Sequence, residues 1–247
     1  MFTSVEMVKT LKYRLKITES IRGKCIISQS KVKLQRSPRK LYIDLKGPEV
    51  LWVEGWNNGK ALVNPGAFPF VNINIDPYNS LMRDGQHHTI HDMGYDYLID
   101  ILKFGVSQAD DRFDKIFLYS GIEKHNERMC YKILINNNNF GYKDYKVLKS
   151  ENLTTIAKKL MVNDYMILIN NNKIKNYNDI EEGDVIKVPS AYAKSVELFL
   201  DKDLYVPVGI SISDEKGLYE DYQYFDLEIN PVITDEEFTK HFKGYHF

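Results

Sequence analysis

Short strand-like runs, separated by connections of only a few residues, recur along the first quarter of the chain. Residues 24–35, 41–45, 50–55 and 60–63 are rich in the aliphatic and aromatic residues that strands favour. The last two runs are joined by Trp56-Asn57-Asn58-Gly59, and Asn-Gly is the strongest short signal for a hairpin. Parallel strands need a crossover of about a dozen residues or more. The pattern therefore predicts an antiparallel meander.

Similar strand-like runs return later, and two amphipathic segments are expected to be helices. Residues 115–119, 128–135, 195–200, 206–212 and 219–229 read as further strands. Val8, Leu11 and Leu15 recur at helical spacing, which predicts a helix over residues 3–21. Met93 and Ile101 belong to the apolar face of a second helix, predicted over residues 89–104.

A compact segment of a different kind interrupts the later strands. Tyr145-Lys146-Val147 reads as a short strand, and Leu153, Ile156 and Leu160 mark one face of a helix. A second short helix at 166–169 and a closing strand at 185–189 complete a β-α-α-β order. Because the meander resumes afterwards, we predict an inserted domain at residues 143–189. Residues 1–142 plus 190–247 then form one discontinuous domain.

This segment resembles the LysM domain. The resemblance rests on Tyr145-Lys146-Val147, the run 153–157, Asn170-Asn171 and the closing run 183–189. It implies a shallow site for peptidoglycan or another chitin-like glycan that contains N-acetylglucosamine. The corresponding residues are Ser150, Glu151, Asn152, Leu153, Asn170, Asn171, Asn172 and Ile180. Ser150-Glu151-Asn152 replaces the usual Gly-Asp-Thr, so the alternative is a structural or protein-docking insert without sugar affinity.

The rest of the chain resembles an uncharacterised bacterial envelope family related to LolA-like lipoprotein carriers. The matching segments are 57–65, 80–83, 86–90, 214–220 and 235–238. The resemblance implies an α+β fold, in which a curved antiparallel half-barrel is closed by the helices at 3–21 and 89–104. In the carriers the apolar interior holds acyl chains. Trp52, Phe68, Phe70 and Tyr78 are the candidate cavity residues here, with an ordinary core position as the alternative for each.

Composition excludes some classes of partner. The net charge is −1, from 33 basic and 34 acidic residues, which gives no pull toward nucleic acid or anionic membrane. No run approaches the ~18 apolar residues of a membrane-spanning helix. The start of the chain lacks the pattern of a signal peptide, which fits either a cytoplasmic protein or an envelope protein whose signal has been removed. Cys25 and Cys130 are expected either to pair or to be small buried side chains.

The chain carries few motifs for chemistry. His87 and His91 have the i, i+4 spacing that places two imidazoles on one helix face for a metal, with Asp92 as a third ligand. The Glu of zinc proteases is missing from positions 88–90, and the alternative is a helix N-terminus. The chain has no glycine-rich phosphate loop and no Gly-x-Ser-x-Gly elbow. We therefore expect no cofactor.

These patterns together predict a non-enzymatic protein of the bacterial cell envelope, periplasmic or associated with the outer membrane. The LysM-like insert would bind peptidoglycan, and the half-barrel would bind a lipid or a lipidated protein. One alternative is a scaffold protein whose insert docks another protein. A second is a cell-wall hydrolase, for which the sequence offers no catalytic motif.

Overall fold

One large antiparallel sheet dominates the fold. The computed structural model describes residues 1–68 and 70–247. The strands of this sheet are β1 (Thr10–Ile21), β2 (Lys24–Gln35), β3 (Lys40–Asp44), β4 (Glu49–Val53), β5 (Ala61–Asn64), β6 (Ile73–Ile75), β7 (Phe117–His125), β8 (Arg128–Asn136), β11 (Ser195–Asp201), β12 (Pro207–Asp214) and β13 (Gly217–Ile229). The helices outside it are α1 (Phe2–Glu6), α2 (Ser80–Arg83), α3 (Asp96–Ala109) and α4 (Phe113–Ile116).

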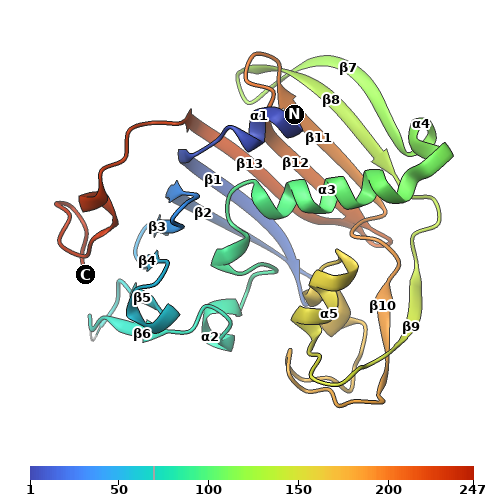
Figure 1. The fold of residues 1–247 in the computed structure, drawn as a ribbon, viewed down its shortest axis with the longest axis horizontal. Coiled ribbons are helices and arrows are strands. Elements are labelled where there is room, and N and C mark those ends of the chain that lie inside the picture. The colour runs from blue at the N-terminus through green and yellow to red at the C-terminus, as the bar shows by residue number, and fades with distance from the viewer. Residues whose placement is uncertain (69) are drawn as a thin grey trace.

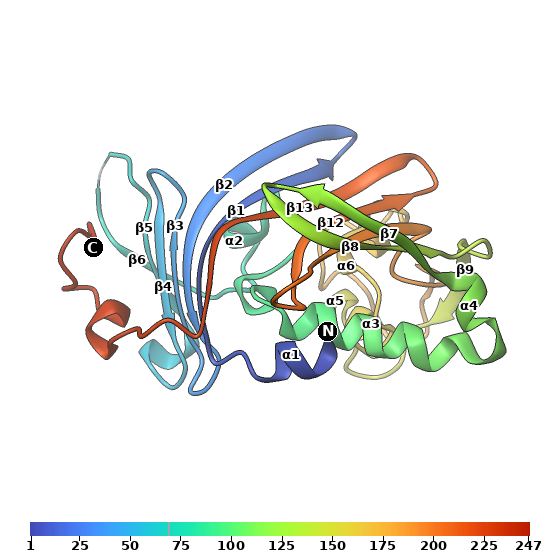
Figure 2. The ribbon, with the colours of Figure 1, turned by 90° about the horizontal axis from the view of Figure 1, so that it is seen from above.

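The eleven strands follow the order β6-β5-β4-β3-β2-β1-β13-β12-β11-β8-β7. The first and last parts of the chain therefore meet where β1 pairs with β13. The sheet curves around its concave face and is open on the other side, as Figure 2 shows from above. The α+β half-barrel predicted from the sequence is confirmed.

The helix predicted over residues 3–21 is wrong. Residues 10–21 form β1, which pairs with β2 along its whole length, from Thr10 opposite Gln35 to Ile21 opposite Lys24. The helix is confined to Phe2–Glu6. Leu11 and Leu15 are spaced for a helix, but Tyr13 between them is also buried. That alternation is the period of a strand with one face in the core.

The second predicted helix exists, but it begins and ends later than residues 89–104. Thr89 starts a single 3-10 turn, in which its backbone N–H donates to the Asp92 carboxylate at 2.9 Å. Gly94 follows with a φ of 88°, a conformation that suits glycine and breaks the helical path. The long helix α3 then runs from Asp96 to Ala109 and lies across the concave face (Figure 1). It is the cover that the half-barrel requires.

The main core lies on the concave face of the sheet and on the side of α3 that covers it. Leu11, Leu34, Leu41 and Trp52 are consecutive cross-strand partners on β1, β2, β3 and β4, and all are buried. Such rows of apolar side chains fix the register, because a slip of one residue would expose them.

A smaller unit lies between β8 and β11, and we call residues 142–189 the βααβ segment. It consists of β9 (Tyr142–Lys146), α5 (Leu153–Leu160), α6 (Asp164–Ile169) and β10 (Val185–Pro189). Asn152 and Asn163 cap the two helices through their side chains. β9 pairs with β10 so that Tyr142 lies opposite Pro189. The two ends of the segment therefore meet, and Figure 1 shows it beside one end of α3.

The βααβ segment has its own apolar core and a second contact with the half-barrel. Its core includes Val147, Ile156 and Val188. Tyr165 and Met166 of α6 pack instead against Ile21 and Tyr219 of the large sheet. The Tyr165 hydroxyl accepts a hydrogen bond from the backbone N–H of Arg22 at 2.8 Å.

The C-terminal segment packs on the outside of the half-barrel. Phe238 joins a cluster with Tyr42 and Leu62, and Tyr245 stacks on Tyr42 with ring centroids 3.7 Å apart. Glu237 lies 2.6 Å from Lys33 Nζ and 3.1 Å from Lys12 Nζ. These contacts anchor residues that follow the last strand.

The two cysteines do not pair. Cys25 lies exposed on β2 and Cys130 buried on β8, and four strands separate β2 from β8 in the sheet. The prediction of two buried thiols holds for Cys130 alone. Among the described residues, no helix has the length and apolar character that crossing a membrane requires.

Candidate functional site

An apolar cavity of about 820 Å³ lies between the concave face and α3. The sheet contributes side chains from both halves of the meander, and α3 contributes one face of its helix. Its apolar lining includes Ile17, Ile210 and Tyr222 on the sheet and Leu98, Ile101 and Leu102 on α3.

The strand register explains why one wall is continuous. Ile17 lies opposite Tyr222, and Tyr222 lies opposite Ile210. These three side chains form one row across β1, β13 and β12, and all face the cavity. On α3, Ile101 and Leu102 follow Leu98 by three and four residues, so they lie on the same face of the helix as Leu98. The cavity is therefore a product of the sheet's alternation and the helix's periodicity.

The βααβ segment supplies part of the cavity wall. Leu160, at the end of α5, and Met161, which follows it, line the cavity. Met161 has a φ of 50° and ends α5 in the left-handed conformation. The chain that returns from β10 contributes Tyr192 and Ala193. The cavity thus lies at the junction of the two parts of the molecule.

One region of the cavity wall is polar. Glu19 comes from β1, and Glu220 comes from β13. His88 and Asp92 come from the loop that leads to α3. The Tyr222 hydroxyl donates to Glu19 Oε1 at 3.1 Å. This part of the wall carries carboxylates, an imidazole and hydroxyls beside otherwise apolar surface.

Glu220 is the centre of this polar region. Its side chain is fully buried and accepts hydrogen bonds from the Asn163 amide at 2.9 Å and from the Tyr192 hydroxyl at 3.0 Å. His87 Nδ1 lies 2.8 Å from the same carboxylate. Since Asn163 also caps α6, this carboxylate ties the βααβ segment to β13.

Aromatic neighbours fix the plane of the His87 ring. Its ring stacks between Tyr165 and Tyr219, with centroid distances of 4.5 Å and 4.3 Å. Its Nε2 lies 3.1 Å from the Ser20 carbonyl oxygen. The side chain is buried, and its backbone N–H donates to Glu19 Oε1 at 3.2 Å.

The protonation of the cluster follows from burial and charge. Burial opposes the ionisation of Glu220, but the positive charge of His88 and the hydrogen bonds of His87 and His88 hold the pKa of Glu220 below its usual range. Burial also disfavours a charged His88, yet Glu220 and Asp92 raise the pKa of His88 well above its usual value. For Glu19 burial wins, and its pKa is raised. The ionised form is therefore less stabilised for Glu19 than for Glu220.

The aromatic residues proposed for the cavity do not line it. Trp52 is buried in the core and donates from Nε1 to the Gly59 carbonyl at 2.9 Å. Phe68 and Phe70 are 88% and 68% exposed, and Tyr78 is also exposed. Among the described residues, the aromatic side chains that do line the cavity are Tyr97, Phe104, Phe117, Tyr192, Tyr222 and Tyr224. Trp52 instead fits the alternative of an ordinary core residue.

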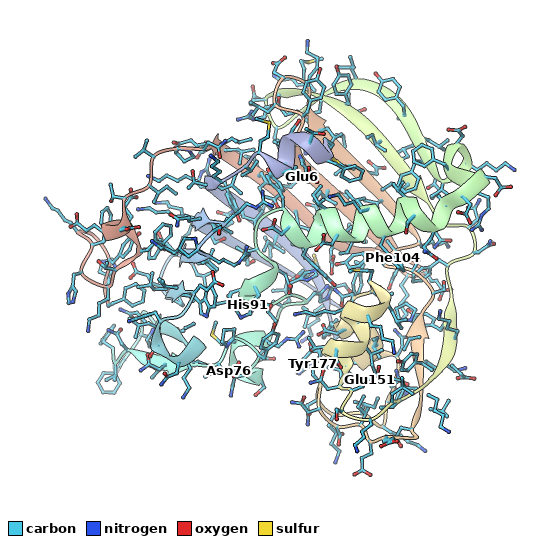
Figure 3. All side chains as sticks on the ribbon, in the orientation of Figure 1. Glu6, Asp76, His91, Phe104, Glu151 and Tyr177 are labelled. Atoms are coloured by element: carbon cyan, nitrogen blue, oxygen red, sulfur yellow. The ribbon has the colours of Figure 1, made fainter. Side chains whose placement is uncertain are left out.

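The two histidines proposed as metal ligands are not brought together. His91 lies in the 3-10 turn, where its ring packs edge-on against Trp52 at 4.8 Å. Figure 3 labels His91 on the part of the chain that precedes α3. His87 precedes that turn and is grouped instead with Glu19 and Glu220. The i, i+4 spacing fails because residues 87 and 91 do not share a helix.

The residues proposed for glycan binding lie on the βααβ segment, and several are engaged in contacts within it. Leu153 is fully buried. Asn152 caps α5, and Asn171 exchanges hydrogen bonds with the Lys187 backbone at 2.8 Å. Glu151 accepts a hydrogen bond from the Tyr145 hydroxyl, and the Asn170 amide donates to the Met166 carbonyl. Ser150 has a φ of 64°. Asn172 is exposed and Ile180 is half-buried.

Sequence reasoning missed Glu19 and Glu220. Glu19 continues the inward-facing positions 11, 13 and 15 of β1, so an acidic residue stands on the core face of a strand. Such a residue is a signal for a buried polar site. The signal was hidden because residues 3–21 read as a helix.

The family of the chain follows from comparison with known proteins. A model of a protein family of unknown function, DUF1571, matches residues 8–149, which is more than half of the chain. The chain belongs to the DUF1571 family. The matched part runs from β1 to the start of the βααβ segment. No curated protein sequence matches the chain.

Several solved structures are similar to this DUF1571 protein at low identity. A DUF1329 family protein from Desulfovibrio piger is 10% identical, covers 96% of this chain over 92% of its own, and has a TM-score of 0.38. An uncharacterised conserved protein from Thermus thermophilus is 9% identical, with coverages of 98% and 92% and a TM-score of 0.42. The lipoprotein LppX from Mycobacterium tuberculosis is 10% identical, with coverages of 94% and 92% and a TM-score of 0.37.

Proposed function

We propose that this protein is a non-enzymatic carrier of the bacterial cell envelope that binds the acyl chains of a lipid or a lipidated protein. The cavity between the concave face and α3 is the observation that carries the proposal. Its volume of about 820 Å³ falls within the roughly 300–1,000 Å³ of ligand sites in proteins.

A space of this size differs from an ordinary packing defect. Protein interiors are close-packed, and the few voids they contain are seldom much larger than a water molecule. An apolar void of this size also gives water few hydrogen-bond partners. The row of Ile17, Tyr222 and Ile210 and the facing side of α3 therefore favour an apolar occupant such as an acyl chain.

The binding test uses the full chain after removal of lipid. A fluorescent fatty acid is titrated into it, and native mass spectrometry of gently extracted protein identifies what is carried. Ile101→Asp places a charge in the cavity and should weaken probe binding by about tenfold or more, because burying an unpaired charge costs several kcal/mol.

A matched control comes from the same helix. Val106→Asp changes a half-buried α3 residue that is not among those lining the cavity, so probe binding should persist. Equal loss in both variants would show that the helix, and not the cavity, was damaged. Failure of the wild-type protein to bind the probe or to carry lipid would refute the proposal.

A glycan-binding role for the βααβ segment is a separate proposal. The β-α-α-β order supports it, together with the exposed Asn172. Titration calorimetry with peptidoglycan or chitin fragments tests it, with Asn172→Ala as the informative variant. Absence of heat and of retention on purified sacculi would remove it.

The scaffold alternative also has a structural observation in its favour. Arg83 of α2 forms a buried ion pair with Asp164 of α6 at 2.8 Å, and the amides of Asn152 and Asn171 are used within the segment. These contacts suit a segment whose role is structural or protein-docking and not the binding of sugar. If Asn172→Ala and the wild type associate equally with the envelope, the scaffold role is favoured.

A further inference from the structure

Three buried side chains from separate parts of the chain converge beside the cavity. Glu19 of β1, Glu220 of β13 and His87 of the loop before α3 each offer one ligand atom, and these atoms lie within 4.8 Å of one another. All three side chains are buried, with exposed fractions of 5%, 0% and 1%. Side chains of these types rarely occupy such positions unless they are paired or bind an ion.

The two ring nitrogens of His87 face oxygen atoms that can only accept hydrogen bonds. Nε2 lies 3.1 Å from the Ser20 carbonyl oxygen, and Nδ1 lies 2.8 Å from Glu220 Oε1. A neutral imidazole has one N–H. If Nε2 donates to the carbonyl, the Nδ1 lone pair points at a carboxylate. A metal ion that binds both Nδ1 and the carboxylate, once these atoms have moved apart from their 2.8 Å contact, removes this repulsion.

We propose that Glu19, His87 and Glu220 bind a divalent metal ion, of the kind that accepts mixed nitrogen and oxygen ligands, such as Zn²⁺ or Mn²⁺. Imidazole and carboxylate are ligands of both ions. The site adds to the acyl-chain cavity and does not depend on it.

The orientation of His87 is the one that metal ligands use. A histidine that binds a metal through one nitrogen usually donates its other N–H to a carbonyl or carboxylate. The Ser20 carbonyl takes that role here, and the stacking of Tyr165 and Tyr219 fixes the plane of the ring. Nδ1 is directed at the Glu220 carboxylate, and Glu19 lies next to it.

The surroundings orient the carboxylates too. Asn163 and Tyr192 donate to Glu220, and Tyr222 donates to Glu19. Glu19 lies opposite Glu220 on the neighbouring strand, and the ligand atoms of the two carboxylates lie within 4.8 Å of each other. A divalent ion would supply positive charge to both carboxylates. Since Glu19 and Glu220 both line the cavity, a remaining coordination position would face the cavity.

Metal binding is measured on the full chain after treatment with a chelator and dialysis. Zn²⁺ and Mn²⁺ are titrated by calorimetry, and Co²⁺ is added as a spectroscopic probe of the ligand set. We expect one ion per chain and visible Co²⁺ absorption typical of low coordination number. The Co²⁺ spectrum needs no variant, so it keeps the test valid if a variant misfolds.

Variants then locate the ion. Glu19→Gln and Glu220→Gln keep the shape of the side chain and remove a ligand charge, so each should abolish stoichiometric binding. Tyr222→Phe removes the hydrogen bond that orients Glu19, and the affinity should fall by roughly 10- to 100-fold, as for other residues that orient metal ligands.

The chain offers a matched control in a second Glu–His pair. Glu49 is 3% exposed, and its Oε1 lies 2.9 Å from His246 Nδ1 on the outside of the half-barrel. Glu49→Gln should leave metal binding unchanged. Loss of binding in this variant as well would point to surface histidines or general damage.

Two results would overturn the proposal. One is the absence of a stoichiometric metal in wild-type titrations. The other is a wild-type Co²⁺ spectrum that Glu19→Gln and Glu220→Gln leave unaltered. The alternative is that a proton, and not a metal ion, lies between Nδ1 and Glu220. Nitrogen NMR of the metal-free chain tests it, because both ring nitrogens of His87 would then carry protons.

Discussion

At the scale of single residues, a few buried charges hold the two parts of the chain together. Arg83 is 4% exposed and stacks on Tyr177, with its guanidinium carbon 3.4 Å from the ring centroid. It also pairs with Asp164 at 2.8 Å. Tyr177 and Asp164 belong to the βααβ segment, whereas Arg83 ends α2. Removing one partner of such a pair leaves the other charge buried.

Arg83→Met should therefore lower the free energy of unfolding by about 3 kcal/mol, measured by urea denaturation. Arg14→Met is the control, since the side chains of Arg14 and Asp226 are 51% and 66% exposed and exposed pairs contribute about 0–1 kcal/mol. Equal effects of the two substitutions would contradict the role given to Arg83.

Glu237 provides a pH-dependent contact. Burial opposes its ionisation, but the hydrogen bonds from Lys33 and Lys12 outweigh burial and lower its pKa below the ordinary 4.5. A carboxyl with a lowered pKa in the folded state stabilises the protein at any pH above 4.5. That contribution is lost as the pH falls through the folded-state value.

We expect Glu237→Gln to cost about 1 kcal/mol at neutral pH, as for a small network of partly exposed ion pairs. The difference from wild type should shrink as urea denaturation is repeated at increasingly acid pH. A difference that stays constant with pH would mean that the charge of Glu237 is not what stabilises the C-terminal segment.

Residue-level prediction from the sequence failed where position depended on three-dimensional register. Phe68 and Phe70 are aromatic and were expected in the cavity, but both are exposed. Glu19 and Glu220 are 201 positions apart in the chain, and only the pairing of β1 with β13 makes them neighbours, since Glu19 lies opposite Glu220. Local patterns contain no information on such a contact.

At the scale of elements, α3 combines a structural role with a lining role, and Gly105 is its least favourable helix residue. A Cβ at this position would lie 3.7 Å from the Phe117 ring, which is ordinary contact. Gly94, before the helix, is different, because its φ is 88° and a Cβ would lie 3.2 Å from Leu34.

Gly105→Ala should raise the free energy of unfolding by about 0.5–1 kcal/mol, and Gly94→Ala should lower it. Thermal denaturation of the two variants gives both signs in one experiment. A loss of stability in Gly105→Ala would show that α3 packs more tightly against β7 than the structure indicates.

Element-level prediction succeeded for the strands with short turns and failed for β1. The antiparallel runs from 24–35 to 60–63 needed only alternation and the Asn58-Gly59 turn. β1 contains Leu11 and Leu15 at a spacing that fits both periods, and its partner β13 lies at the far end of the chain. Three apolar residues at helical spacing, Val8, Leu11 and Leu15, were too little evidence to rule out a strand.

At the scale of the whole molecule, the half-barrel and the βααβ order both followed from the sequence, whereas their mutual packing did not. The pairing of Tyr142 with Pro189 makes excision of the βααβ segment a direct test of its status. Replacing residues 143–188 by a two-residue turn should leave a folded half-barrel with a lower urea midpoint, because Ile21 and Tyr219 lose Tyr165 and Met166. An unfolded product would contradict the division into two domains.

Cavity occupancy should also be visible in global stability. A ligand that binds only the folded state adds about 2.7 kcal/mol when its free concentration is one hundred times Kd. Delipidated protein should therefore melt at a lower temperature than protein reloaded with a fatty acid. Ile101→Asp should abolish this difference, whereas Val106→Asp should retain it.

Leu160 and Met161 belong at once to the βααβ segment and to the cavity wall. A partner that shifted α5 would therefore change the shape of the cavity. If such a shift changed the affinity of the cavity for its ligand, a bound ligand would change the affinity for the partner by the same factor, because the coupling between two binding sites is reciprocal.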